Sequence, residues 1–119
     1  MTVFADKFRI YQVVTNLITN AIKYSPITSE VNVRVREFNN KALVSVEDFG
    51  IGVEKGEKQK IFDKLYQVAD DTGQNFAGFG MGLYISKEIV KRHKGQIWVE
   101  SEKDKGSIFY FTLPLGKTN

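Results

Sequence analysis

The stretch from about Lys7 to Lys23 constrains the fold most, because it has the periodicity of an amphipathic helix crossed by a line of polar residues. Its apolar residues follow the three-and-four spacing of one broad helix face. They are Phe8, Tyr11, Val14, Leu17, Ile18, Ala21 and Ile22. A second set of polar residues stacks along one edge of the same helix, and its members are Gln12, Asn16, Asn20 and Lys23. The chain must therefore pack this helix against another layer while two amides and an amine share one ridge.

Two interpretations of this polar ridge remain open from the helix alone. A buried amide without a partner costs roughly 1–3 kcal/mol, so Asn16 and Asn20 must face water or bind a ligand. The first interpretation is a solvated helix face. The second is a ligand site, because an amide oxygen suits Mg²⁺ and the ammonium of Lys23, one turn on, suits phosphate.

Length and composition limit the possible classes of protein. A chain of 119 residues is long enough for one domain with a core and too short for two. It contains no cysteine, which excludes disulfides, thiolate metal sites and cysteine nucleophiles. The single histidine, His93, cannot build a zinc site by itself. We therefore expect one domain over residues 1–119.

Charge and hydropathy exclude two kinds of partner. The net charge of +3 is accompanied by acidic residues interleaved through most of the chain, without a basic stripe carrying stacking aromatics. We expect no nucleic-acid partner and at most a mild affinity for phosphate. The apolar runs are short and the N-terminus lacks a signal pattern, so we expect no direct membrane contact and a cytoplasmic location.

The first half of the chain predicts a helix followed by a hairpin. Residues 1–4 have the pattern of a short edge strand, and Asp6 is a suitable helix N-cap. The helix ends before Pro26. Residues 30–38 alternate as a half-buried strand, with the valines at 31, 33 and 35 on one side. Asn39 and Asn40 then turn the chain into an antiparallel partner over residues 42–48.

The second half predicts a lid, a helix and a second hairpin. A short helix is expected around residues 57–62, followed by a polar, aperiodic segment over about 65–81 that is typical of a functional lid. A helix runs from the glycines near 82 to about His93, and strands follow at 96–101 and 107–113. This order predicts an α+β two-layer sandwich, with a mixed, mostly antiparallel sheet of about five strands covered on one face by about three helices.

Two further features point to a ligand. The glycines at 78, 80 and 82 precede a helix N-terminus, where exposed N–H groups and the helix dipole favour an anion, although they also suit a hinge. Asp48 ends a strand just before two glycines, Gly50 and Gly52. Its carboxylate either accepts hydrogen bonds within the turn or accepts one from the exocyclic amine of adenine, a position where guanine presents an acceptor.

Together these residues resemble the catalytic and ATP-binding domain of sensor histidine kinases, within the superfamily that also holds gyrase, Hsp90 and MutL ATPases. The resemblance covers about residues 6–114 and implies a Bergerat-type ATP-binding fold. It rests on five short motifs that occur in the family order. They are Asn16-x-x-x-Asn20 with Lys23-Tyr24, Asp48-x-Gly50-x-Gly52, Phe62 with Tyr66, Gly78-x-Gly80-x-Gly82-Leu83, and Gly106-Ser107.

The resemblance implies a role for each motif residue. Asn20 and Asn16 would hold Mg²⁺, Lys23 and Tyr24 would lie by the phosphates of ATP, and Asp48 would bind adenine. Phe62 and Tyr66 would anchor the lid, whose end would reach the phosphates. The remaining residues expected to line the nucleotide site are Gly50, Gly52, Gly78, Gly80, Gly82, Leu83 and Ser107.

The resemblance also implies the reaction. Hydrolytic members of the superfamily carry a glutamate where this sequence has Asn16, and an amide cannot accept a proton as a general base. The expected reaction, with Asn16 and Lys23 as its catalytic residues, is transfer of the γ-phosphate to a histidine. That histidine would lie on a separate helical dimerisation domain, which would pass the phosphate to a response regulator. His93 does not match the phosphoacceptor motif, so the chain is expected to be a catalytic half.

Departures from the family pattern leave alternatives open. Gln67 stands where the family often has an arginine, which Lys64 replaces only in part, and Leu65 and Phe79 replace a frequent phenylalanine and threonine. The first alternative is a regulatory module that binds nucleotide without transferring phosphate. The second is a serine kinase of the anti-sigma type in the same superfamily.

Overall fold

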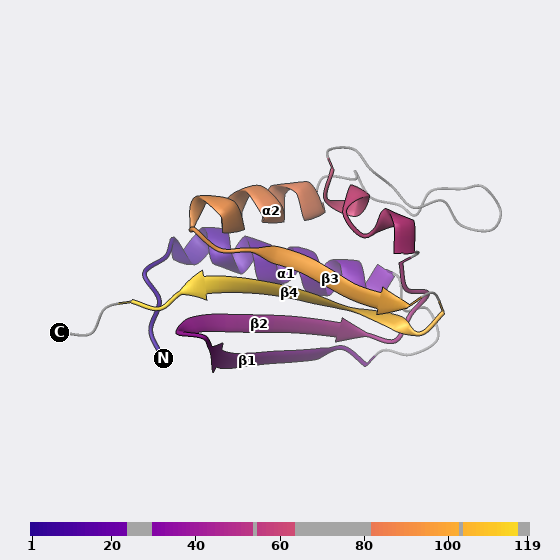
Figure 1. Cartoon of the computed structure of the whole chain (residues 1–119), viewed down its shortest axis with the longest axis horizontal. Coiled ribbons are helices and arrows are strands. Elements are labelled where there is room, and N and C mark those ends of the chain that lie inside the picture. The colour runs from indigo at the N-terminus through magenta and orange to yellow at the C-terminus, as the bar shows by residue number, and fades with distance from the viewer. Residues whose placement is uncertain (24–29, 54, 64–81, 103, 117–119) are drawn as a thin grey trace.

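A two-layer arrangement, with helices on one face of a single sheet, is the architecture of this chain (Figure 1). The computed structural model describes residues 1–23, 30–53, 55–63, 82–102 and 104–116. Within these ranges the sheet has four antiparallel strands in the order β1-β2-β4-β3. The elements are α1 (Lys7–Lys23), β1 (Asn32–Phe38), β2 (Lys41–Asp48), α2 (Gly82–Arg92), β3 (Ile97–Glu102) and β4 (Gly106–Pro114), with 3-10 turns η1 (Lys55–Glu57) and η2 (Lys60–Phe62). The predicted α+β class is confirmed.

The first helix begins at the predicted cap. The Asp6 carboxylate accepts hydrogen bonds through Oδ1 from the backbone N–H groups of Phe8, at 3.0 Å, and Arg9, at 3.2 Å. These two N–H groups have no partner inside the helix, so the cap satisfies them. It also places a negative charge at the positive end of the helix dipole.

Removal of this cap should have a measurable cost. We expect Asp6→Ala to lower the free energy of unfolding by about 1 kcal/mol, which corresponds to a fall in Tm of roughly 4 °C. Asp6→Asn is the matched control, because an asparagine keeps an oxygen that accepts the same bonds. Thermal unfolding followed by circular dichroism should show Asp6→Asn close to wild type. Equal losses in both variants would contradict the capping role.

The turn between β1 and β2 follows the predicted chemistry. Asn39 and Asn40 have φ angles of 51° and 62°, in the left-handed region. Asparagine tolerates this region better than most residues. The turn sets Phe38 opposite Lys41, and the register of the whole hairpin follows from that pair.

The core lies between the helices and the inner face of the sheet. Phe111 and Phe109 of β4 are 0% and 2% exposed, and the ring of Phe62 packs edge-on against Phe109 with centroids 6.1 Å apart. The helices add Val13, Leu17 and Ala21 of α1 and Ile89 and Val90 of α2.

The predicted broad apolar face of α1 is wrong in detail. The fully buried row is Val13, Leu17 and Ala21, and Val13 was not among the residues assigned to that face. Phe8, Tyr11 and Ile22 are exposed by 80%, 72% and 62%. The helix contacts α2 on one flank and β2 below. The fully buried part of the helix is therefore a stripe at four-residue spacing, with Ile10, Val14 and Ile18 partly buried beside it.

The prediction of a half-buried first strand is also wrong. Val33 and Val35 alternate as expected, yet they are 45% and 59% exposed. β1 is an edge strand, and α1 packs over its neighbour β2 (Figure 1). The alternation therefore reports which way the side chains point and not how far the helical layer extends.

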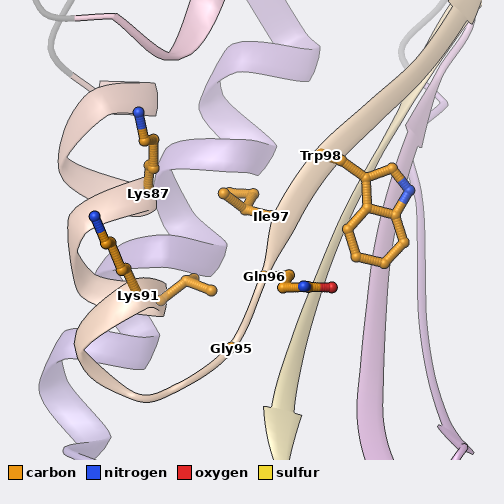
Figure 2. Close-up of a pocket in the computed structure, with 7 residues that line it drawn as sticks. Lys87, Lys91, Gly95, Gln96, Ile97 and Trp98 are labelled. Atoms are coloured by element: carbon orange, nitrogen blue, oxygen red, sulfur yellow. The ribbon is translucent and has the colours of Figure 1, made fainter. Parts of the chain in front are cut away.

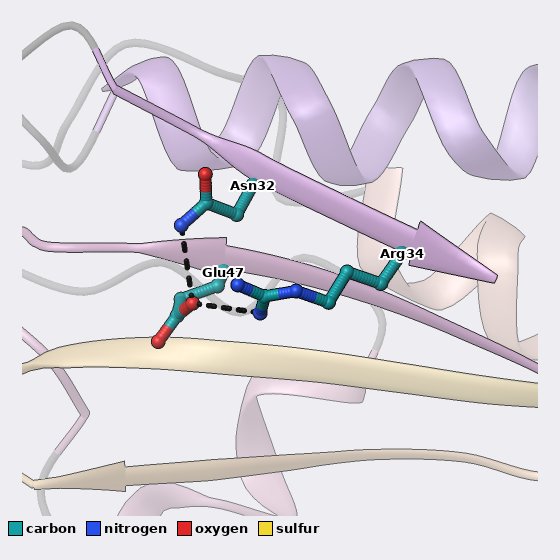
Figure 3. Close-up of polar contacts among 3 residues, drawn as sticks. All are labelled: Asn32, Arg34 and Glu47. Carbon is teal, nitrogen blue, oxygen red and sulfur yellow. Dashed lines mark hydrogen bonds and ion pairs between the residues drawn. The ribbon is translucent and has the colours of Figure 1, made fainter. Parts of the chain in front are cut away.

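On the opposite face of the sheet, polar contacts join β1 to β2. The carboxylate of Glu47 accepts hydrogen bonds through Oε1 from Asn32 Nδ2 at 3.3 Å and from the guanidinium Nη1 of Arg34 at 3.2 Å (Figure 3). The Arg34 side chain is 66% exposed, so the ion pair adds little to stability. Charged residues along an edge strand do discourage pairing with other chains.

The predicted element counts are corrected at two places. The expected strand at residues 1–4 contributes only an isolated bridge between Val3 and Leu115. The expected helix around 57–62 is replaced by the two 3-10 turns η1 and η2, since Gly56 weakens the first turn of a helix. The predicted lid, about 65–81, lies outside the described residues.

Candidate functional site

The amide of Asn16 joins α1 to the beginning of α2. Its Nδ2 donates to the carbonyl oxygen of Gly82 at 3.3 Å and to the hydroxyl oxygen of Ser86 at 3.3 Å. The side chain of Ser86 is fully buried between the helices. Because both bonds use Nδ2, the amide oxygen of Asn16 is left without a hydrogen bond to any residue in the described ranges. The sequence motifs that contain Asn16 and Gly82 are thus brought into contact.

Asn20 and Lys23 continue the same edge of α1 away from this contact. Asn20 is partly buried, and its side chain forms no hydrogen bond with any residue that the structure describes. Lys23 is the last residue of the helix and is exposed. At the other end of the ridge, the oxygen of Gln12 accepts a hydrogen bond from Arg9 at 3.3 Å. The predicted polar ridge therefore exists, and the amide oxygens of Asn16 and Asn20 accept no hydrogen bond from the part of the chain that the structure describes.

The carboxylate of Asp48 is buried at the end of β2. It is 3% exposed, and its Oδ1 accepts a hydrogen bond from the backbone N–H of Gly50 at 2.9 Å. Burial raises the pKa of Asp48, and the negative charge of Glu47 adds to that rise, while hydrogen bonds from the backbone N–H groups of Gly50 and Ser107 oppose it. A buried carboxylate with few donors favours a ligand that supplies another one.

Beside Asp48, the loop after β2 packs closely against the β3–β4 hairpin. The Ser101 hydroxyl oxygen accepts a hydrogen bond from Val53 N–H at 2.6 Å and lies 2.9 Å from the carbonyl oxygen of Gly106, to which it donates. Gly52 has a φ of 72°, and a Cβ there would lie 2.1 Å from the carbonyl oxygen of Glu102. Only a glycine fits this close approach of two backbones.

An open groove of about 590 Å³ runs past this end of the sheet. Its polar lining comprises Asp48, Ser101 and Ser107, the lysines Lys58 and Lys105, and the carboxylates of Glu47, Glu100 and Glu102. Ser107 is buried and lies opposite Asp48 in the sheet register. The groove is large enough for a small organic ligand, and its buried polar groups are of the kind that orient one.

The predicted residues thus fall into two groups. One group comprises Asn16, Asn20 and Lys23 on α1 and Gly82 and Leu83 at the start of α2, where the hydrogen bond is between Asn16 and Gly82. The other group lies at and just after the strand ends and comprises Asp48, Gly50, Gly52 and Ser107. Phe62 lies in the core against Phe109, and its role as a lid anchor stays a prediction. Tyr24, Tyr66, Gly78 and Gly80 lie outside the described residues, as do Lys64, Leu65, Gln67 and Phe79.

Two residues with structural roles at or near the site, Ser86 and Ser101, were missed from the sequence. Ser86 carried a signal, since it shares the three-and-four spacing of Ile89 and Val90 and must be buried with them. Ser101 carried none. The ring of His93, which does not match the phosphoacceptor motif, has a structural role. Its Nε2 accepts a hydrogen bond from Asp6 N–H at 3.1 Å, and its Nδ1 donates to the carbonyl oxygen of Ile89 at 2.8 Å.

Residues 5–117 match the family described as histidine kinase-, DNA gyrase B- and HSP90-like ATPase. The chain belongs to this ATPase family. Its relatives include the adaptive-response sensory kinase SasA of Rippkaea orientalis, which is 41% identical over 96% of this chain and 29% of the relative. The sensor histidine kinase WalK of Bacillus subtilis is 41% identical over 92% of this chain and 18% of its own length. The chain therefore spans less than a third of these relatives.

Solved structures of histidine kinases share the fold of this ATPase-family chain. The mycobacterial sensor histidine kinase MprB aligns with a TM-score of 0.82 and 26% identity, over 94% of this chain and 74% of that one. The catalytic domain of histidine kinase ThkA aligns with a TM-score of 0.77 and 32% identity, over 92% and 69%. The chain is thus an ATP-binding catalytic domain of the histidine-kinase type. Among its described helices, none has the length and apolar character needed to cross a membrane.

Proposed function

We propose that this domain binds ATP between the Asn16–Asn20 edge of α1 and the buried Asp48, and transfers the γ-phosphate to a histidine of a separate helical dimerisation domain. The observation that carries the proposal is the amide of Asn16. It stands where hydrolytic relatives are expected to have a glutamate, and its Nδ2 is already committed to Gly82 and Ser86. An amide held in this way can position a ligand but cannot remove a proton from water.

The amide oxygens along this edge of α1 are suitable ligands for magnesium. The oxygens of Asn16 and Asn20 are one helical turn apart on the same edge. Magnesium binds hard oxygen ligands and usually takes few of them from the protein, sharing the rest with phosphates and water. We therefore assign these two amides to the ion, which when bound would neutralise phosphate charge.

The remaining residues are assigned either to the adenine base or to the phosphates of the nucleotide. Asp48 accepts a hydrogen bond from the adenine amine, beside Ser107 and the glycines at 50 and 52. We assign Lys23 and Tyr24 to the phosphates, together with Leu83 and the glycines at 78, 80 and 82, and we assign Phe62 and Tyr66 to the support of the lid expected over about 65–81. The amine of Lys23, at the end of α1, offers a mobile positive charge to the phosphates.

Transfer then requires an acceptor from outside this chain. A ring nitrogen of the acceptor histidine attacks the γ-phosphorus, the bond to the bridging oxygen breaks, and ADP leaves with its electron pair. The role of the chain is to hold the phosphates in line with that nitrogen, because little bond chemistry falls to the protein. Without the acceptor domain we expect very slow turnover.

A similar full-length kinase supports this assignment. The structure of full-length ShkA in complex with AMPPNP aligns over 98% of this chain with a TM-score of 0.84 and 26% identity, and the chain covers 23% of that protein. A longer kinase containing this domain would supply the dimerisation domain and pass phosphate to a response regulator. We expect the isolated domain to be a monomer without a nucleic-acid partner.

Two measurements test the proposal. Calorimetric titration with a non-hydrolysable ATP analogue should show binding that strengthens with Mg²⁺ and exceeds that of the GTP analogue. Incubation with labelled ATP and candidate helical dimerisation domains should then produce a label that is lost in acid, as phosphohistidine is. Binding without any transfer would favour the regulatory alternative, and an acid-stable label would favour a serine kinase.

A further inference from the structure

A second groove lies at the other end of β3, away from the candidate nucleotide site. It has a volume of about 440 Å³ and runs between the flank of α2 and the edge of the sheet (Figure 2). Lys87, Val90 and Lys91 line it from the helix, and Gln96, Ile97 and Trp98 line it from the strand. β3 is an edge strand in the order β1-β2-β4-β3, so its outer side has no neighbouring strand among the described residues.

Some backbone N–H and C=O groups at this edge point away from β4, where the described residues supply no neighbouring strand. The carbonyl oxygen of Gln96 accepts a hydrogen bond from Thr112 N–H at 2.9 Å. In an antiparallel ladder alternate residues bond to one neighbour, so Ile97 and Val99 direct their N–H and C=O groups away from β4. The far end of the strand is covered by the Gly52–Val53 loop. Val99 is only 7% exposed, so the accessible part of the edge is the stretch around Ile97.

The side chains around this edge differ between its two faces. On the helix face, Lys87 and Lys91 stand one turn apart, and neither forms an ion pair with any residue that the structure describes. Figure 2 shows Ile97 pointing toward α2 and Trp98 pointing to the opposite face. There the indole of Trp98 stacks on the Tyr110 ring with centroids 5.2 Å apart. One face thus offers positive charge and the other an aromatic platform.

We propose that this edge binds an extended, acidic segment of a partner protein by strand addition. Backbone hydrogen bonds to Ile97 align the segment. Alternate side chains of an added strand point to opposite faces. Acidic residues on one side of it reach Lys87 and Lys91, and aliphatic or aromatic residues on the other pack on Trp98.

A second copy of this chain is a poor occupant for the same edge. Two β3 edges placed side by side would present Ile97 and Val99 of one copy to the lysines of the other. Those residues carry no charge to balance Lys87 and Lys91, and the lysines of both copies would approach one another. Charge complementarity therefore favours an acidic partner of a different sequence.

The chain contains a reporter for this binding, because Trp98 is its single tryptophan. We would titrate the full chain at low salt with the blocked peptide Glu-Phe-Glu-Val-Glu-Phe-Glu and follow tryptophan emission. We expect a saturable change, no response to the same peptide with lysine in place of glutamate, and binding about tenfold weaker for Lys87→Glu/Lys91→Glu. The affinity of that variant for the ATP analogue should equal wild type, which separates this edge from the nucleotide site.

Matched controls make the test decisive. Arg36→Glu/Lys41→Glu changes the same charge on the opposite edge of the sheet, in β1 and at the start of β2, and should bind the peptide like wild type. Lys87→Gln/Lys91→Gln should give an intermediate loss. A peptide with N-methyl groups on the pairing residues should not bind. Unaltered binding of the methylated peptide, loss in the β1-edge variant, or no saturable response would each overturn the proposal.

Discussion

Asp48→Asn should weaken the binding of ATP roughly 150-fold, a change of about 3 kcal/mol in binding free energy. The carboxylate is 3% exposed and already accepts a hydrogen bond from Gly50 N–H. Adenine supplies a second donor. An asparagine that keeps the Gly50 bond through its oxygen presents its own NH₂ group to the adenine amine, so two donors meet with no acceptor between them.

The same substitution should stabilise the nucleotide-free protein at neutral pH. Burial raises the pKa of Asp48 in the folded state. Between the unfolded and folded pKa values the folded protein therefore holds more protons than the unfolded chain, and its stability falls as the pH rises through that window. The uncharged amide of the Asp48→Asn variant avoids this loss. The difference in Tm should thus favour Asp48→Asn near pH 7 and shrink as the pH is lowered toward about 4.

Calorimetric titration with the ATP analogue and thermal unfolding across this pH range measure the two effects. Asp6→Asn is a suitable control, because it makes the same chemical change at an exposed helix cap whose contacts lie at the start of α1. It should alter neither nucleotide affinity nor the pH dependence attributed to Asp48. Wild-type affinity in Asp48→Asn would show that adenine does not meet this carboxylate.

Sequence periodicity predicted the elements well and their burial poorly. The bounds of α1 and the turn at Asn39 and Asn40 follow from local chemistry, namely a cap, a spacing and a tolerance of positive φ. The exposure of Tyr11 and Val35 depends on how far each layer extends over the other. That property belongs to the packed molecule, so no window of sequence contains it.

The candidate site was likewise predictable from the sequence only in part. Asp48 was singled out because it ends a strand just before two glycines, but the sequence left open whether its carboxylate serves the turn or a ligand. The structure shows that it is buried and accepts the turn bond from Gly50. The contact of Asn16 with Ser86 spans 70 positions of sequence, and no local pattern links them. The residue types identified the groups that could bind a ligand. Only the fold showed which of these groups are held in place by hydrogen bonds to distant residues, as Asn16 is by Ser86.

Gly52→Ala is expected to destabilise the protein by about 3 kcal/mol and to weaken nucleotide binding as well. The residue has a φ of 72°, where a side chain adds strain, and its Cβ would lie 2.1 Å from the carbonyl oxygen of Glu102. Backbone cannot rotate away as a side chain can. The loop after β2 and the β3–β4 hairpin must therefore separate, which breaks the 2.6 Å bond from Val53 N–H to the Ser101 hydroxyl.

Separating the loop from the hairpin should also weaken nucleotide binding, because the same hairpin positions Asp48. Ser107 lies opposite Asp48, and Gly106 approaches the Asp48 carbonyl so closely that a Cβ there would lie 2.2 Å from it. Gly56→Ala is the matched control, since a Cβ at that position meets nothing within 4 Å. Chemical denaturation should show the loss for Gly52→Ala and a change within about 0.5 kcal/mol for Gly56→Ala. Similar stabilities for the two variants would mean that the loop and hairpin do not depend on their close approach, and that Asp48 is positioned by β2 alone.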